Sequence, residues 1–234
     1  MGAIFRREIG SFFTSSIAYV FLACFYLLSG ILFYTGNFLS GTSDMSEFFS
    51  IVLYLLVILV PILTMKSFSE EKKQKTEQGL LTAPVSLGSI IMGKYFAVFV
   101  VFLCGVSITL VYAAILSFFG TVDWIAILSN YSALVISGAA FIAIGIFISS
   151  LTENQAVAAV LGIVALFILT FLDLIAQQID ISIISDVLNA LSFYNKYYEF
   201  TCGIFNLSNL LFYVSAAAIF NFLTVRIFEK RRWA

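Results

Sequence analysis

The chain has 234 residues, of which 62% are hydrophobic and 11% are charged, and its formal net charge is −1. A soluble domain is typically about 45–50% apolar and about 25% charged, so the composition predicts a single all-α polytopic membrane domain over residues 1–234. With no histidine and three cysteines that form no CxxC pair, we expect no metal site. The sequence has no nucleophile–base pair and no carboxylate dyad within a span, so we expect no catalytic constellation, and we expect no nucleic-acid partner.

The first expected element is an interfacial amphipathic helix over residues 3–14. Its apolar half contains Ile4, Phe5, Ile9, Phe12 and Phe13. Arg6 and Arg7 fall on the opposite side of the helical wheel. Glu8 lies within the apolar half, where a carboxylate is costly unless it has a partner. It either points toward the lipid headgroups or forms an ion pair with a lysine of the polar segment described below.

Six apolar runs are long enough to cross about 30 Å of hydrocarbon, which takes about 20 helical residues. They cover residues 17–38, 48–65, 95–119, 124–150, 156–175 and 207–228. Pro61 lies near the end of the second run and is expected to kink it. Gly145 with Ser149, and Ala158 with Gly162, are small residues four apart that favour close helix packing. Thr152 is the expected N-cap of the fifth run.

The basic residues predict the orientation of the spans. Eleven of the twelve lysines and arginines lie before the first run, between runs two and three, or after the last run, and Lys196 is the exception. Positive charge is enriched in cytoplasmic loops. We therefore expect a multi-pass protein of the cytoplasmic (inner) cell membrane with both termini in the cytoplasm.

The longest polar interval connects the second and third runs, over residues 66–94. Residues 67–78 contain good helix formers and neither Gly nor Pro. Leu80 and Leu81 follow but belong to no span, Pro84 ends any helix that contains them, and Ser86 is a suitable cap for the next. A solvated loop is one interpretation of such a charged run. A short cytoplasmic helix that presents its leucines to another protein is the other.

The same interval contains Gly88-Ser-Ile-Ile-Met-Gly93-Lys94, which resembles part of a phosphate-binding loop. That motif needs a hydroxyl residue after the lysine and a strand before the loop, whereas Tyr95 follows here and a span begins. The motif is therefore interpreted as packing glycines at positions 88 and 93, with Lys94 extending to the membrane interface.

Residues 176–206 form the longest outer connection, between the fifth and sixth runs. Its aromatic residues are Phe193, Tyr194, Tyr197, Tyr198, Phe200 and Phe205. An aromatic-rich segment of this kind is expected to be interfacial or re-entrant. Asp173, at the end of the fifth run, is expected at the outer interface rather than in the hydrocarbon.

Three stretches resemble ABC-2 type transporter permeases: SEEKKQKTEQGLLTAPVSLGSIIMGKY, ISSLTENQAVAA, and LSFYNKYYEFTCGIFNLSNLLFYV with the ending FEKRRW. In that family the first is the inner loop, the second a turn between spans four and five, and the third the outer segment, last span and basic tail. The resemblance covers essentially the whole chain. Within that family, the sequence is similar to the small six-span permeases of the gliding-motility and nitrous-oxide-reductase-maturation type.

The resemblance implies a membrane subunit without an ATPase site or cofactor of its own, with ATP and Mg²⁺ bound by two partner ATPase subunits. A second permease chain completes the implied complex, and a further partner could carry an extracytoplasmic domain. The implied ATPase-coupling residues are Glu70, Glu71, Thr76, Glu77, Leu80, Leu81, Thr82 and Pro84, beside Arg6, Arg7 and Glu8 of the N-terminal helix.

The function expected from this resemblance is ATP-driven export, or extraction of a substrate from the membrane. The alternative is a membrane scaffold whose polar segment recruits a cytoplasmic protein without transport. An ion-coupled carrier is disfavoured because such proteins place ionisable groups near the midplane of the membrane, where this sequence has none.

Overall fold

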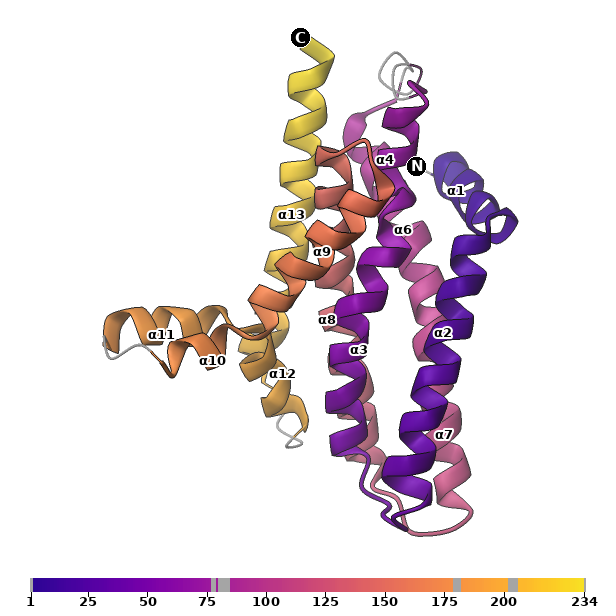
Figure 1. Ribbon diagram of the computed structural model, residues 1–234, viewed down its shortest axis with the longest axis vertical. Coiled ribbons are helices and arrows are strands. Elements are labelled where there is room, and N and C mark those ends of the chain that lie inside the picture. The colour runs from indigo at the N-terminus through magenta and orange to yellow at the C-terminus, as the bar shows by residue number, and fades with distance from the viewer. Residues whose placement is uncertain (1, 77–78, 80–84, 179–181, 202–205, 234) are drawn as a thin grey trace.

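The computed structural model describes residues 2–76, 79, 85–178, 182–201 and 206–233. The described residues form helices and no strands, which confirms the predicted all-α fold. The long helices stand side by side in a bundle, and the N- and C-termini lie toward the same end of it (Figure 1).

The helices follow one another as α1 (Gly2–Thr14), α2 (Ser16–Phe33), the π-helix η1 (Tyr34–Phe38), α3 (Ser46–Thr64), α4 (Lys66–Lys73), α6 (Leu87–Val106), α7 (Ile108–Ser117), α8 (Trp124–Leu151), α9 (Gln155–Thr170), α10 (Leu172–Ala176), α11 (Ser182–Leu191), α12 (Phe193–Thr201) and α13 (Leu207–Trp233).

Five helical stretches of the described chain are long and apolar enough to cross a membrane: Ser16–Phe38, Ser46–Lys73, Leu87–Ser117, Trp124–Leu151 and Leu207–Arg232. The third begins at Leu87, eight residues before the expected position, and Ser86 caps it as predicted by accepting a hydrogen bond from the N–H of Ser89. The predicted fifth span divides at Phe171 into the shorter apolar helix α9 and α10. Its N-cap is Asn154 and not Thr152, because the Asn154 side chain accepts from the N–H of Ala156.

Helix α8 is the centre of the bundle and packs against α3, α6, α9 and α13. Small residues allow this packing. A Cβ on Gly145 of α8 would lie 2.2 Å from Oγ1 of Thr64 in α3, and one on Gly162 of α9 would lie 2.8 Å from Cβ of Pro61 in α3. The glycine of each predicted small-residue pair therefore lies at a helix contact, and Pro61 of α3 packs against Gly162 of α9.

Helix α4 follows α3 after a break at Met65. Ser149 of α8 forms hydrogen bonds with the backbone groups at this break. The Ser149 hydroxyl donates to the carbonyl of Met65 over 2.9 Å. It accepts from the N–H groups of Phe68 at 3.1 Å and Ser69 at 3.2 Å. The first N–H groups of a helix have no partner within the helix, so Ser149 supplies an acceptor and places α4 relative to α8.

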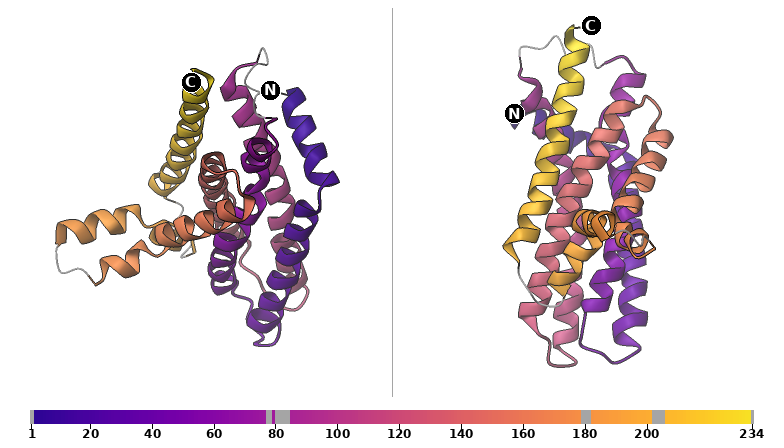
Figure 2. Two further views of the ribbon diagram at one scale, coloured as in Figure 1. Left: turned by 45° about the horizontal axis from the view of Figure 1, so that its top comes forward. Right: turned by 90° about the vertical axis from the view of Figure 1, so that its left-hand side faces the viewer.

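The connection between α9 and α13 contains two different arrangements. Helix α12 packs into the bundle, where the buried Tyr197 donates to the Phe49 carbonyl at 3.1 Å and Tyr213 of α13 donates to the Phe193 carbonyl at 2.6 Å. Helices α10 and α11 project sideways from the bundle (Figures 1 and 2). Asp173 of α10 is buried and accepts from the Ser192 hydroxyl at 3.4 Å.

Candidate functional site

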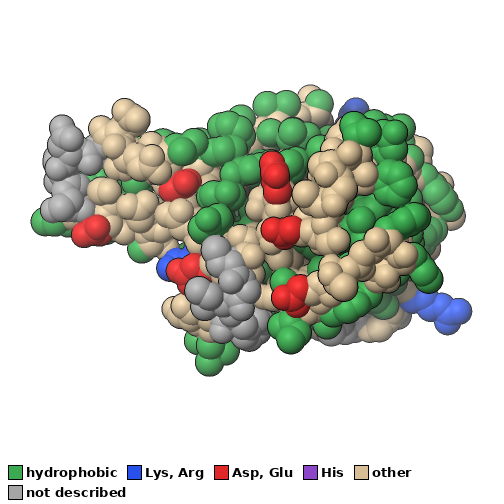
Figure 3. All heavy atoms as spheres, turned by 90° about the horizontal axis from the view of Figure 1, so that it is seen from below, with side chains coloured by type: hydrophobic (Ala, Val, Ile, Leu, Met, Phe, Trp, Pro, Cys, Tyr) green, Lys and Arg blue, Asp and Glu red, His purple; other side chains and the backbone are tan. Residues whose placement is uncertain are grey.

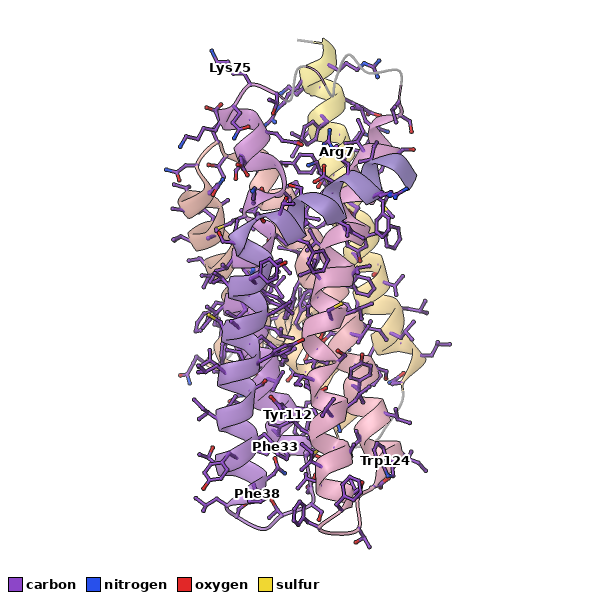
Figure 4. All side chains as sticks on the ribbon, turned by 90° about the vertical axis from the view of Figure 1, so that its right-hand side faces the viewer. Arg7, Phe33, Phe38, Lys75, Tyr112 and Trp124 are labelled. Carbon is purple, nitrogen blue, oxygen red and sulfur yellow. The ribbon has the colours of Figure 1, made fainter. Side chains whose placement is uncertain are left out.

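Helix α1 runs across the long helices near the end of the bundle that carries the termini, and Arg7 lies on it (Figure 4). It packs mainly against α6. Close approach is possible because Gly93 has no side chain: a Cβ there would lie 3.0 Å from Cγ2 of Ile4. Phe12 on the apolar half of α1 is buried. The amphipathic helix predicted over residues 3–14 therefore covers protein with its apolar side.

An ion-pair network joins α1, α4 and α6 through Lys94, and we call Arg7, Glu8, Glu71 and Lys94 the inner ion network. Lys94 Nζ lies 3.2 Å from Glu8 Oε2 and 2.9 Å from Glu71 Oε1. Arg7 Nη2 lies 2.7 Å from Glu8 Oε1 and 3.3 Å from Glu71 Oε1. The two positive and two negative formal charges of the network cancel. Glu8 of α1 and Lys94 of α6 form a pair although they lie 86 positions apart in the sequence.

The inner ion network is protected from solvent on its Lys94 side. The Lys94 side chain is 3% exposed and that of Glu8 10%, whereas the Arg7 side chain is 56% exposed. Lys94 Nζ also lies 5.1 Å from the centroid of the Phe68 ring, a distance at which a cation is attracted to an aromatic face. Because the charges are buried and mutually paired, removing one would leave an uncompensated charge in the protein.

The environment shifts the pKa of one member. The hydrogen bond to Glu8 raises the pKa of the Arg7 guanidinium further above its usual value, so Arg7 stays charged. Glu71 Oε2 is buried and accepts no hydrogen bond from the described residues.

A cleft of about 400 Å³ opens between α1 and α4 and is lined by all four members of the inner ion network. Other contacts hold α4 from its remaining sides. The Phe68 ring lies 4.6 Å from that of Phe228 in α13, and Lys72 Nζ lies 3.4 Å from Glu153 Oε1 in the turn before α9. Helix α4 is thus fixed to α1, α6, α8, α13 and the turn before α9, while its far end continues into residues 74–76.

The structure places some of the predicted coupling residues and not others. Glu70 and Glu71 lie on α4, and Thr76 follows it, with its hydroxyl donating to the Glu71 carbonyl at 3.3 Å. Arg6 is exposed on α1, beside Arg7 and Glu8. Glu77, Leu80, Leu81, Thr82 and Pro84 lie outside the described residues. The ion pair expected between Glu8 and a lysine of the polar segment is confirmed, and that lysine is Lys94.

Residues 88–94 form the first turns of α6, which agrees with the rejection of a phosphate-binding loop. Two other expectations about the glycine-rich motif are corrected. Lys94 does not extend into solvent, because its side chain is buried and paired with Glu8 and Glu71. Of the two glycines, Gly93 contacts α1, whereas no described atom lies within 4 Å of a Cβ added at Gly88.

The role of Ser149 was not apparent from the sequence, in which this residue was predicted only to allow close helix packing. Its hydroxyl contacts residues 80 or more positions earlier in the chain. No local pattern distinguishes it from its neighbour Ser150. In contrast, the unusual position of Glu8 on an apolar helix face was a signal that a cation had to lie nearby.

Comparison with known proteins gives a match to one family over nearly the entire chain. The model of the ABC-2 family transporter proteins matches residues 3–233. A search of curated proteins gives no match. The family match agrees with the all-helical bundle and its membrane-length apolar helices. On these grounds the chain belongs to the ABC-2 family of transporter proteins and is a multi-pass membrane permease subunit of an ABC transporter.

Proposed function

We propose that this permease couples ATP hydrolysis by two separate ATPase subunits to the export of a substrate, or to its extraction from the bilayer. The family implies ABC ATPase partners, and the observation that carries the proposal is the inner ion network. It ties a surface helix, α1, to α4 and to the first turns of the membrane-length helix α6.

This arrangement can transmit a displacement from the polar end of the bundle into the spans. An ATPase that binds residues 70–84 pushes on α4 and on the start of α6 from the cytoplasm. Because Glu71 and Glu8 share Lys94, α1 and α6 move with α4 rather than past it. Helix α4 also follows α3 directly, so a second membrane-length helix receives the same displacement.

The complex that we propose has both termini and the α1–α4 end in the cytoplasm of a cell whose inner membrane holds the bundle. Two permease chains and two ATPase subunits form it, ATP and Mg²⁺ are bound by the ATPases, and an extracytoplasmic domain would come from a further partner. The distribution of lysine and arginine supports this orientation.

Leu80 and Leu81 provide the test of the ATPase contact. They lie in the cytoplasmic segment outside every span, so the double replacement L80S/L81S leaves insertion into the membrane unchanged. Burial of one leucine contributes about 1.5–3 kcal/mol, and such anchors can dominate a small interface. We expect the double variant to retain less of the cognate ATPase in a pull-down and to lose the stimulation of ATP hydrolysis in nanodiscs.

The matched control replaces Lys73 and Lys75 by Gln, since these lysines are exposed and their charges are screened at physiological salt. Lys72 is kept because it pairs with Glu153. The ATPase retention of this control should stay near that of the unchanged chain. Wild-type retention and stimulation by L80S/L81S would contradict the proposed contact. If the unchanged permease binds the ATPase but never stimulates hydrolysis with candidate lipids present, the scaffold function is correct instead.

A further inference from the structure

Helices α6 and α13 pack against each other and leave a groove of about 420 Å³ between them, which we call the α6–α13 groove. Met92 and Tyr95 of α6 line one wall. The other wall comes from α13 and consists of Ala217, Ala218, Asn221, Phe222 and Val225. Both helices belong to stretches that are long and apolar enough to cross a membrane. The groove is therefore open to the bilayer, where apolar molecules and not water are available to fill it.

The groove continues toward the end of the bundle that carries α1 and α4. Gly88, Met92 and Tyr95 follow one another at intervals of four and three residues, so they lie on one face of α6. Met92 and Tyr95 line the groove, and a Cβ added at Gly88 would meet no described atom within 4 Å. This face of α6 is thus open for one further turn beyond Met92, toward the start of the helix.

Arg226 of α13 places positive charge at this end of the groove. Its guanidinium carbon lies 4.8 Å from the centroid of the Phe222 ring, which lines the groove. The Arg226 side chain is 62% exposed, and one of its nitrogens pairs with Glu229 at 2.7 Å. Residues 226–232 contain four basic residues and one acidic residue, which gives a formal net charge of +3. The opposite end of the bundle differs, because acidic side chains gather on its face (Figure 3).

We propose that the α6–α13 groove binds one anionic phospholipid, with an acyl chain between the two helices and the headgroup phosphate beside Arg226. The apolar walls match the chain. A guanidinium has five N–H donors, so Arg226 retains donors for a phosphate while it pairs with Glu229. Basic sites between membrane helices are known to hold anionic headgroups. The inference goes beyond the proposed transport function, because this lipid is a bound constituent of the permease and not the molecule that it moves.

The charge at the groove favours lipid over a second permease chain as its occupant. In a two-fold symmetric dimer, a contact uses the same surface on both chains. A contact through this groove would therefore bring two segments of net charge +3 toward each other. An anionic headgroup instead compensates part of the charge, while its acyl chain covers the same apolar side chains.

A tryptophan in the groove reports which lipid lies beside it. Phe222→Trp places an indole at a lining position, in a background where Trp124 and Trp233 are replaced by Phe. The full chain is reconstituted in vesicles of phosphatidylglycerol and phosphatidylethanolamine, and either one or the other lipid carries brominated acyl chains, which quench a nearby indole. We expect phosphatidylglycerol to occupy this position about fivefold more readily, the preference that one basic residue gives at an anionic surface.

Two changes should remove this preference. Arg226→Gln keeps a polar side chain of similar shape and removes the charge, so the two lipids should then quench the indole at position 222 equally. Raised salt should have the same effect without any further substitution, since an exposed charge is screened. Phe167→Trp in the same background is the control reporter, because Phe167 is 53% exposed on α9 and does not line the groove. It should show no preference at any salt concentration.

A filled groove tests the position of the acyl chain. Ala218 is exposed on the wall of the groove, so Ala218→Phe places a ring in the space assigned to the lipid, and both brominated lipids should quench the indole at position 222 less. Ile219→Phe is the matched control, because Ile219 is 55% exposed on α13 outside the groove. Quenching should stay unchanged in that variant.

The proposal is overturned if the two lipids quench the indole at position 222 equally, or if Arg226→Gln keeps the preference for phosphatidylglycerol. The same preference at positions 222 and 167 would show a general enrichment of anionic lipid around the protein and would contradict a specific site. If neither brominated lipid quenches the indole at position 222, a second permease chain covers the groove and the proposal is wrong.

Discussion

Lys94 shows how the surroundings of one residue decide its role. A lysine at the start of an apolar run is normally expected to extend toward water. Here two carboxylates from different helices reach it first, and its side chain is 3% exposed. A buried cation is tolerated only when it is paired, so Glu8, Glu71 and Lys94 have to be considered as one unit.

Replacement of Lys94 by Met should therefore be strongly destabilising. It leaves Glu8 and Glu71 buried with only the exposed Arg7 as partner, and breaking a buried pair in this way costs about 3–5 kcal/mol. The free energy of unfolding can be measured by SDS titration in mixed micelles. The triple variant Glu8→Gln, Glu71→Gln and Lys94→Met should recover most of the loss.

Arg226→Met is the control for this prediction. Arg226 Nη1 lies 2.7 Å from Glu229 Oε2, but the two side chains are 62% and 41% exposed. An exposed pair contributes about 0–1 kcal/mol. If Lys94→Met and Arg226→Met lower the free energy of unfolding equally, the inner ion network contributes no more to stability than an exposed ion pair.

At the scale of the elements, α4 is placed by contacts with other helices and not by its own sequence. Most of its eight residues are polar, and Ser149 of α8 bonds three of the backbone groups at its junction with α3. Phe68 is the buried contact between α4 and α13. A helix held in this way can transmit a displacement without unfolding.

Ser149→Ala should loosen the junction between α3 and α4. It removes one buried acceptor and one buried donor, and an unsatisfied buried polar group costs about 1–3 kcal/mol. Hydrogen exchange should increase at the N–H groups of Phe68 and Ser69. Ser150→Ala is matched in composition, but the Ser150 hydroxyl bonds only to Phe147 within α8, so exchange in α4 should not change. Identical exchange in both variants would contradict the assigned role of Ser149.

At the scale of the whole molecule, the two ends of the bundle differ in charge. The end with α1 and α4 carries the inner ion network and most of the basic residues, whereas Asp44 and Asp123 lie at the other end. The proposed orientation requires the first end to face the cytoplasm.

Single cysteines introduced at Asp44 and at Gln74 in a cysteine-free background test this orientation. Cys24, Cys104 and Cys202 are first replaced. An impermeant thiol reagent added to intact cells should label position 44 and should label position 74 only after the cells are permeabilised. Labelling of position 74 in intact cells would reverse the proposed topology. A further cysteine at Ser182 should behave like the one at position 44.

The sequence by itself determined the fold class, the approximate spans and the amphipathic N-terminal helix. These features depend on composition and on the periodicity of neighbouring residues, which act through local backbone geometry and transfer of side chains from water. Even the need for a partner at Glu8 was visible, because a carboxylate on an apolar helix face is costly without one. The division of the fifth run at Phe171 was not visible, since both of its parts are apolar.

Only the tertiary structure decided which residues meet. Lys94 is 86 positions from Glu8, and Ser149 is 81 from Phe68. Asp44, Asp123 and Asn130 line one cleft although the two aspartates come from different connections and Asn130 comes from α8. No periodicity in a single chain specifies such pairs, because they depend on how the helices are packed against each other. Steric details such as the contact of Gly145 with Thr64 set that packing, and they become apparent only when all helices are in place.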